Sequence, residues 1–301
     1  MVRTTKKPQT WKQTVRNIML AHPASKLLLN HADAWGTALI ISMVMLLVHD
    51  AVTPQTVLLL GAYSGGYWLA FALNDFYDAP VDALDPTKRE RNYFVGRQVG
   101  RGKLTAVLLP LLLFFLVVFA QFGRLGLLLL ALCLFIMWSY SAPPLRLKSR
   151  PGLDILTHAL FVQTFPYIMG LLLISARWTL LDGFIIAILF FASLTAQIEQ
   201  QVRDFAVDAQ MEQTFATRLG HGRTNWLLKA TTAIMMLIAI VGLAIRIFPP
   251  FIITFGALAL PAFLHRFLRQ QHVPRSEWLV LGSIGAAVVY TTAVFIYSLY
   301  Q

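Results

Sequence analysis

Long apolar stretches follow one another along most of this chain, and they restrict it to a membrane-spanning fold. The stretch 104–121 contains no charged residue, and a helix needs about 20 mostly apolar residues to cross roughly 30 Å of hydrocarbon. Hydrophobic residues make up 57% of the chain and charged residues only 13%. A soluble core would need polar faces between such stretches. The pattern is therefore typical of a multi-pass membrane protein.

The apolar stretches predict an all-α fold of nine transmembrane helices packed as one bundle. A backbone that crosses lipid must pair its own polar groups, and the alternating pattern of a membrane β-barrel is not seen in this sequence. We expect one transmembrane domain over 31–301, preceded by a cytoplasmic or interfacial N-terminal segment over 1–30. The expected spans are 31–49, 55–74, 104–121, 125–141, 154–175, 181–200, 225–246, 251–267 and 278–299.

The net charge of +11 is explained by topology rather than by nucleic-acid binding. With a cytoplasmic N-terminus, 22 of the 25 Lys and Arg residues fall on the cytoplasmic side of the predicted spans and three on the other side. This is the positive-inside distribution of membrane proteins. We therefore expect an integral membrane protein, in contact with lipid, whose loops 75–103, 142–153 and 201–224 face the cytoplasm.

An acidic motif, NDFYDAPVD, begins near the end of the second predicted span. Asn74, Asp78 and Asp82 are spaced by four residues, which keeps them on one face of a helix with about 40° of drift per step. Polar groups near the membrane are costly and usually serve a function. A divalent cation removes the repulsion between the carboxylates, and oxygen ligands of this kind suit Mg²⁺ together with substrate phosphates.

A second acidic motif, QIEQQVRDFAVDAQ, repeats this spacing. Gln200, Asp204 and Asp208 again provide an amide followed by two carboxylates at the end of a predicted span. A single motif of this kind is more often a solvated helix end, but two of them match a metal-bridged diphosphate. Such metals draw charge from a leaving diphosphate, so an allylic C–O bond can ionise while the apolar interior holds the chain.

Three motifs together resemble those of the UbiA superfamily of intramembrane prenyltransferases. NDFYDAPVD and RDFAVD are similar to its two acidic motifs, and YSAPPLRLKSRPGLD is similar to its YSxPP segment. The resemblance implies an enzyme that ionises an isoprenyl diphosphate donor, transfers the prenyl group to a lipophilic acceptor and releases diphosphate. Asp78 and Asp204 would then be catalytic, and the implied Mg²⁺ ligands are Asn74, Asp78, Asp82, Asp204 and Asp208.

Basic and aromatic residues near these motifs have two interpretations. Lys148, Arg146 and Arg203, together with Asn74, are expected to bind the diphosphate, and the two cations Lys148 and Arg203 are counted as catalytic because they compensate the charge of the leaving group. Tyr140 is a catalytic candidate that shields a carbocation with its ring. Topology and a membrane-interface position explain the same residue types.

Three further carboxylates stay open as ligands. Asp75 is rotated by about 100° from the face shared by the first motif, Asp85 precedes a proline in a turn, and Glu199 adjoins the second motif. These positions allow a ligand role or a structural role.

The acceptor is predicted only by resemblance. YSAPPLRLKSRPGLDILT most resembles the carotenoid-elongating branch, so the best candidate acceptor is a carotenoid such as lycopene. Quinone, chlorophyll and ether-lipid prenyltransferases share much of the pattern, and a terpene cyclase would quench the cation internally. An ion-coupled membrane transporter is the alternative from another class, but its broken helices lie at the membrane midplane, whereas these acidic motifs lie at helix ends.

Overall fold

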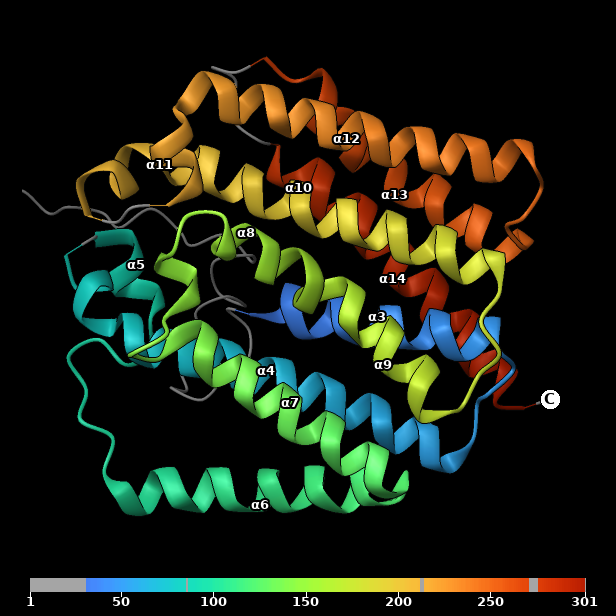
Figure 1. Ribbon diagram of the computed structural model, residues 1–301, viewed down its shortest axis with the longest axis horizontal. Helices are drawn as coiled ribbons and strands as arrows, with labels where there is room; N and C mark the ends of the chain where they lie inside the picture. The colour runs from blue at the N-terminus through green and yellow to red at the C-terminus, as the bar shows by residue number, and fades with distance from the viewer. Residues whose placement is uncertain (1–30, 85, 212–213, 271–275, 301) are drawn as a thin grey trace, which may run out of the picture.

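The computed structural model describes residues 31–84, 86–211, 214–270 and 276–300, and all regular elements in these ranges are helical (Figure 1). The expected N-terminal segment 1–30 lies outside them. The all-α prediction is confirmed. The long helices are α3 (Ala32–Val48), α4 (Pro54–Asp82), α6 (Arg101–Ala120), α7 (Gly123–Ser141), α10 (Leu180–Met211), α12 (His221–Ala244), α13 (Pro250–Leu268) and α14 (Glu277–Ser298).

Shorter elements complete the described chain. The fifth predicted span is a continuous run of α8 (Leu153–His158), the π-helical turn η2 (Ala159–Thr164) and α9 (Phe165–Leu173). Within the described ranges, eight helices or runs are long and apolar enough to cross a membrane, and the shorter apolar stretch Trp35–Val48 of α3 occupies the first predicted span. This is consistent with the nine-span bundle. The remaining elements are α5 (Pro86–Arg91), η1 (Leu147–Ser149) and α11 (Phe215–Leu219).

Two helices extend beyond their predicted ends. The prediction ended the second span at residue 74 and the sixth at residue 200, whereas α4 continues to Asp82 and α10 to Met211. These extra turns are too polar for hydrocarbon, so a search for apolar stretches does not detect them. Both acidic motifs therefore lie on continuous helices that project beyond the apolar segments.

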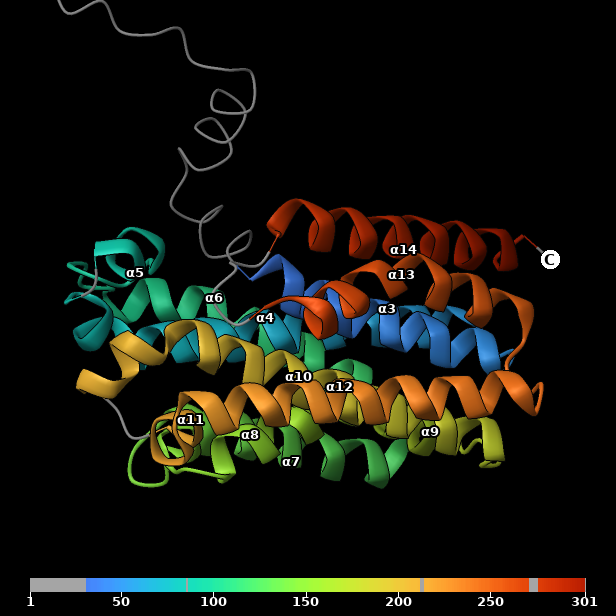
Figure 2. The ribbon, with the colours of Figure 1, turned by 90° about the horizontal axis from the view of Figure 1, so that it is seen from above.

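The helices alternate in direction, so their connections gather at two ends of the bundle. The short helices α5 and α11 lie at the same end, which also contains the C-terminal ends of α4 and α10 (Figure 1). Helix α6 lies at the edge of the bundle, where it packs against α4 and α7. Figure 2 shows α13 and α14 on one side of the bundle and α7, α9 and α12 on the other.

Two apolar clusters of the core lie on either side of α4 and α9. One joins α4, α6, α7 and α9 and includes Tyr63 and Phe115. The other joins α3, α4, α9, α10 and α14 and includes Met45 and Tyr167. Large apolar side chains are also exposed on the outer helices, for example Val117 at 62%. An outward apolar surface of this kind suits a helix that contacts lipid.

The π-helical turn η2 is stabilised by hydroxyl groups from three places. Pro166 follows it closely and has no N–H for the helical ladder, which explains a local break. Three side-chain hydroxyls donate to backbone carbonyls in the turn and just before it. The hydroxyl donors are Tyr67 to the Phe161 carbonyl, Thr164 to the Ala159 carbonyl (2.9 Å) and Ser193 to the His158 carbonyl (3.0 Å).

A buried carboxylate joins three helices at the end of the bundle opposite α5. The side chain of Asp182 in α10 is fully buried and contacts His49 Nε2 at 2.8 Å and the Tyr167 hydroxyl at 2.8 Å. Its second oxygen accepts bonds from the Thr179 N–H and the Thr179 hydroxyl, both at 2.7 Å. Because these donors come from α9, from the end of α3 and from the residue before α10, the carboxylate holds the three helices together.

We expect the Asp182→Asn variant to unfold at a lower temperature than the parent protein. The new side chain places an NH₂ group where a carboxylate oxygen of Asp182 accepted hydrogen bonds, so a donor faces other donors. Loss of hydrogen bonding by such a buried group lowers the free energy of unfolding by about 1–3 kcal/mol. Thermal unfolding in detergent measures the change. Asp50→Asn, at an exposed position of the same end, is the matched control and should stay within about 0.5 kcal/mol of the parent. Equal stability of the two variants would contradict this role of Asp182.

Candidate active site

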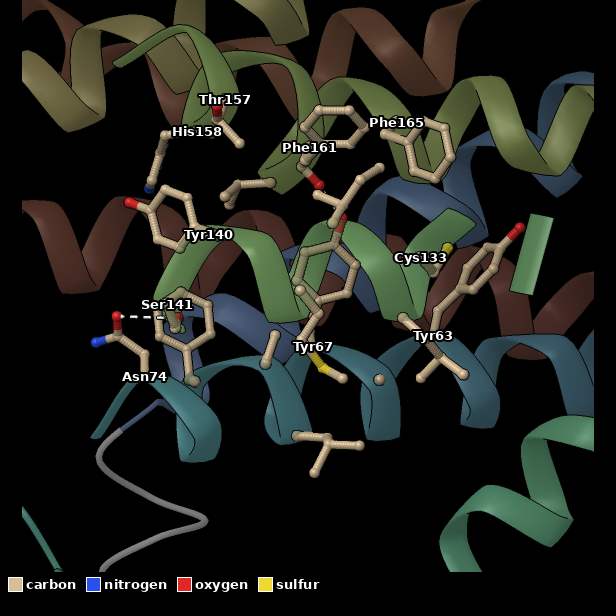
Figure 3. A pocket seen from close by; sticks show the side chains of 18 of the residues that line it. Tyr63, Tyr67, Asn74, Cys133, Tyr140, Ser141, Thr157, His158, Phe161 and Phe165 are labelled. Atoms are coloured by element: carbon tan, nitrogen blue, oxygen red, sulfur yellow. Dashed lines mark hydrogen bonds between the residues drawn. The ribbon is translucent and has the colours of Figure 1, made fainter. Parts of the chain in front are cut away.

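A pocket of about 230 Å³ opens between α4, α7 and the α8–α9 run, with α10 contributing to one end. Its deep end is lined by apolar and aromatic side chains, including Tyr63 and Phe165, and its other end by Asn74, Ser141 and Tyr140 (Figure 3). Ser141 Oγ is 3.4 Å from Asn74 Oδ1. The pocket therefore has one polar end, and this end meets the first acidic motif.

Oxygens of the first acidic motif converge on a single ammonium group. Asn74 Nδ2 donates to Asp78 Oδ2 at 3.0 Å, which confirms that the two residues share a helix face. Lys148 Nζ donates to Asn74 Oδ1 at 2.9 Å and also to Asp78 Oδ1. Arg146 Nη2 lies 3.3 Å from the same Asp78 oxygen. The structure thus brings Asn74 and Asp78 together with two of the three predicted diphosphate-binding cations.

The segment after α7 turns sharply and brings Arg146 and Lys148 to the end of α4. Helix α7 ends at Ser141, and Pro143 and Pro144 cannot continue it because neither has a backbone N–H. Arg146 then adopts a left-handed conformation with φ of 36°, directly before η1. This reversal returns the side chain of Lys148 to the end of α4.

Asp154 anchors the far end of this segment. Its carboxylate is 1% exposed and accepts bonds from Gly152 N at 2.7 Å, Gln201 Nε2 at 2.6 Å and Phe215 N at 2.9 Å. The segment that contains Lys148 is therefore tied to α10 and to the start of α11. The prediction did not single out Asp154, because its partners lie about 50 and 60 residues away in the sequence.

Asn92 is a second residue that the sequence pattern did not reveal. Its buried side chain donates from Nδ2 to Asp82 Oδ2 and to the Asp75 carbonyl, both at 2.7 Å, and its Oδ1 accepts a bond from Phe94 N at 2.8 Å. These bonds hold the loop after α5 against the end of α4. A lone polar residue among charged loop residues carries no periodic signal, so only the contacts identify it.

The open carboxylates Asp75 and Glu199 both have partners outside the pocket. Asp75 Oδ2 lies 2.8 Å from His31 Nε2, on the side of α4 that faces α3. Glu199 is 5% exposed and pairs with Arg266 Nε at 2.8 Å and Arg269 Nη2 at 3.1 Å. Its contacts join α10 to α13 and to the residue just beyond it. Asp85 lies outside the described residues.

The second acidic motif lies on α10. Asp204 accepts a bond from Arg203 Nε at 3.0 Å, and the Arg203 side chain is 50% exposed, so Arg203 does not join Lys148 at Asp78. Asp208 is partly buried further along the helix. Gln200, which begins the motif, lines the pocket as Asn74 does.

The carboxylates of the two motifs lie on two different helices, α4 and α10. Within the described ranges, no three His, Cys, Asp or Glu side chains lie close enough to hold one metal ion. Each motif offers two carboxylates and an amide on its own helix. The amides that begin the two motifs, Asn74 and Gln200, both line the pocket.

A helical membrane bundle with an apolar pocket and acidic motifs at its polar end defines a class of intramembrane lipid-modifying enzymes. The model of the UbiA prenyltransferase family matches residues 34–299, so the chain belongs to this family of prenyl-transferring enzymes. A lycopene elongase/hydratase of Haloferax volcanii is 30% identical over 169 residues. This match covers 54% of this chain and 52% of that relative. This chain therefore spans about half of the relative's length.

Solved structures with the same fold include UbiA homologues from Archaeoglobus fulgidus and Aeropyrum pernix K1. A UbiA homologue from Archaeoglobus fulgidus, described as bound to GPP and Mg²⁺, aligns with a TM-score of 0.71 at 22% identity over 93% of this chain and 100% of that one. The form bound to DMAPP and Mg²⁺ has a TM-score of 0.67 at 22% identity over 91% and 97%. The apo homologue from Aeropyrum pernix K1 gives 0.62 at 17% identity over 88% and 95%. These likenesses support the fold.

We expect Asn92→Ala to loosen the loop between α5 and α6. Loss of the Asn92 bonds leaves the Asp82 carboxylate and the Asp75 carbonyl without this donor, so the loop should open more often. Limited trypsin digestion, with cleavage at 88–103 followed by mass spectrometry, should proceed at least about 5-fold faster. Gln98→Ala, at an exposed position of the same loop, is the control. Equal cleavage rates in both variants would contradict the anchoring role.

Proposed function

We propose that this protein is an intramembrane prenyltransferase that ionises an isoprenyl diphosphate, transfers the prenyl group to a lipophilic acceptor and releases diphosphate. The observation that carries the proposal is the convergence of Asn74, Asp78 and Lys148 at the polar end of an apolar pocket. An amphiphilic donor needs this combination, because its diphosphate requires charged partners while its hydrocarbon chain requires an apolar wall.

The oxygens of the acidic motifs fit Mg²⁺. Asn74 and Asp78 already direct two oxygens at one cation, the Lys148 ammonium, so this corner of the pocket accommodates positive charge. Bound Mg²⁺ would neutralise the charge that develops on the leaving diphosphate. The homologue structures described with Mg²⁺ and isoprenyl diphosphates support the assignment. The proposed ligands are Asn74, Asp78, Asp82, Asp204 and Asp208.

The basic residues would exchange their carboxylate partners for phosphate oxygens. Lys148 and Arg146 now contact Asp78, and a bound diphosphate offers them a second anion in the same corner. Arg203, half exposed beside Asp204, would approach from α10. As the C–O bond breaks, its electron pair leaves with the diphosphate, and these cations compensate the growing charge.

The pocket wall would protect the allylic cation from water. Tyr140 lines the pocket at its polar end, next to Ser141 and near Asn74, where the reacting carbon of the donor would lie (Figure 3). An aromatic ring face stabilises a nearby cation by its quadrupole. Tyr140 would therefore act beside the reacting carbon, while the apolar side chains beyond it hold the chain.

A carotenoid such as lycopene is the proposed acceptor. The lycopene elongase/hydratase of Haloferax volcanii supports this choice over the half of the chain that it matches. Purified protein supplied with Mg²⁺, isoprenyl diphosphates of several chain lengths and a panel of lipophilic acceptors tests it by product mass. A quinone, chlorophyll or ether-lipid product would assign another branch of the family, and a cyclic product from the donor alone would indicate a cyclase.

We expect Asp78→Asn and Asp204→Asn each to lower turnover by at least about 10²-fold while leaving the protein folded. Each change removes a carboxylate that acts on charge in the transition state. Excess chelator should abolish turnover of the parent enzyme. Asp50→Asn at the opposite end of the bundle is the matched control and should keep parental turnover. Retention of more than about a tenth of turnover in both site variants, or full turnover in chelator, would refute the metal-bridged mechanism.

The orientation of the bundle is a further proposal, supported by the distribution of basic residues. The diphosphate-binding end should face the cytoplasm, because 22 of the 25 Lys and Arg residues belong to that side. In a Cys133→Ser background, Gln98→Cys should react with a membrane-impermeant thiol reagent only from the cytoplasmic side. Arg177→Cys, exposed at the other end, should react only from the opposite side. The reverse pattern would overturn the orientation.

A further inference from the structure

His158 lies at the end of α8, directly before the π-helical turn η2, and lines the pocket between Thr157 and Phe161. Figure 3 shows its side chain extending from that wall toward Tyr140 at the polar end. Short π-helical turns are rare and occur often at functional sites. His158 therefore stands beside the position where the proposed reaction would take place.

The contacts of Ser193 define which nitrogen of His158 carries the proton. Ser193 is fully buried in α10, and its Oγ lies 3.0 Å from the His158 carbonyl oxygen and 3.3 Å from His158 Nδ1. A hydroxyl has one proton, and the carbonyl is only an acceptor. The shorter contact assigns the Ser193 proton to the carbonyl, and in that arrangement Nδ1–H donates to the Ser193 oxygen. A neutral imidazole with its proton on Nδ1 has a free lone pair on Nε2.

The pocket wall offers few other groups that accept a proton. Among the described residues that line it, none is Asp, Glu, Lys or Arg. The nearby Asp78 carboxylate is paired with Lys148 and Arg146. The Tyr67 hydroxyl already donates to the Phe161 carbonyl. Nε2 of His158 is thus a base in a wall whose other described groups are apolar or neutral polar side chains.

We propose that His158 is the catalytic base that removes a proton from the acceptor after the prenyl group is added, an assignment that rests on the proposed function. The π electrons of an acceptor double bond form the new C–C bond to the allylic carbon, which leaves a carbocation on the acceptor. A proton on the adjacent carbon moves to Nε2, and its C–H electron pair restores a double bond. The imidazolium then gives the proton to the released diphosphate or to water.

Ser193 is the positioning residue in this proposal. Its oxygen keeps the imidazole proton on Nδ1, as partner groups do for catalytic histidines elsewhere. Ser42 provides a matched comparison, because it is also fully buried and donates to a helix carbonyl, Ala38 O, at 2.8 Å. It is not among the residues that line the pocket.

Two assays separate the role of His158 from ionisation of the donor. The first measures Mg²⁺-dependent release of diphosphate from dimethylallyl diphosphate in the presence of the acceptor that captures the prenyl group. The second measures transfer to lycopene, or to whichever panel acceptor the parent enzyme prenylates, with the product identified by mass and double-bond position. His158→Gln keeps a polar side chain that takes up no proton. It should release diphosphate within about 3-fold of the parent and lose the normal product by at least about 10²-fold, with a displaced double bond or a hydroxylated product instead.

Ser193→Ala keeps the imidazole and removes its partner. It should lower the yield of the normal product about 10-fold with parental diphosphate release, while Ser42→Ala should match the parent in both assays. Formation of the normal product at the parental rate by His158→Gln would overturn the proposal. So would a result in which His158→Gln and Ser193→Ala each lose diphosphate release and prenyl transfer to the same extent. If the parent protein forms no prenylated product with any acceptor of the panel, the proposed prenyl transfer fails instead.

Discussion

Hydrocarbon offers no hydrogen-bond partner to a peptide group, and the architecture of this protein follows from that constraint. Each spanning segment is helical because a helix pairs its own backbone groups. Just before Pro166, the hydroxyls of Tyr67, Thr164 and Ser193 donate to carbonyls of the π-helical turn and of the residue before it. Tyr67 and Ser193 belong to α4 and α10, so these two neighbouring helices enclose the irregular turn. The same enclosure places His158 and Phe161 on the wall of the pocket.

The same constraint moves charged chemistry to the end of the bundle. Isolated charges in hydrocarbon are costly, so the carboxylates of α4 and α10 lie on helical turns beyond the apolar segments and pair with cations. At the opposite end, Asp182 is buried only because four donor contacts surround it. One polar end and one apolar pocket together suit a donor that is itself half ionic and half hydrocarbon.

Much of the fold and part of the site follow from local sequence patterns. Apolar length predicts the spans, and the four-residue spacing of Asn74 and Asp78 predicts the shared face that their 3.0 Å contact confirms. Apolar length alone gives spans that end at residues 74 and 200, whereas α4 and α10 continue over the acidic motifs, as the four-residue spacing of those motifs predicts. The anchoring residues Asn92 and Asp154 were not predicted, since their partners come from other elements and no period marks them.

The sequence by itself therefore determined the all-α membrane fold, the family motifs and the residue types of the site, because each depends on composition or on short spacings along a helix. The tertiary structure decided which cation meets which carboxylate. Lys148 reaches Asp78 through a left-handed turn at Arg146, whereas Glu199, next to the second motif, pairs with Arg266 near the end of α13. Contacts between distant segments depend on turn direction and on helix packing, which local periodicity does not encode.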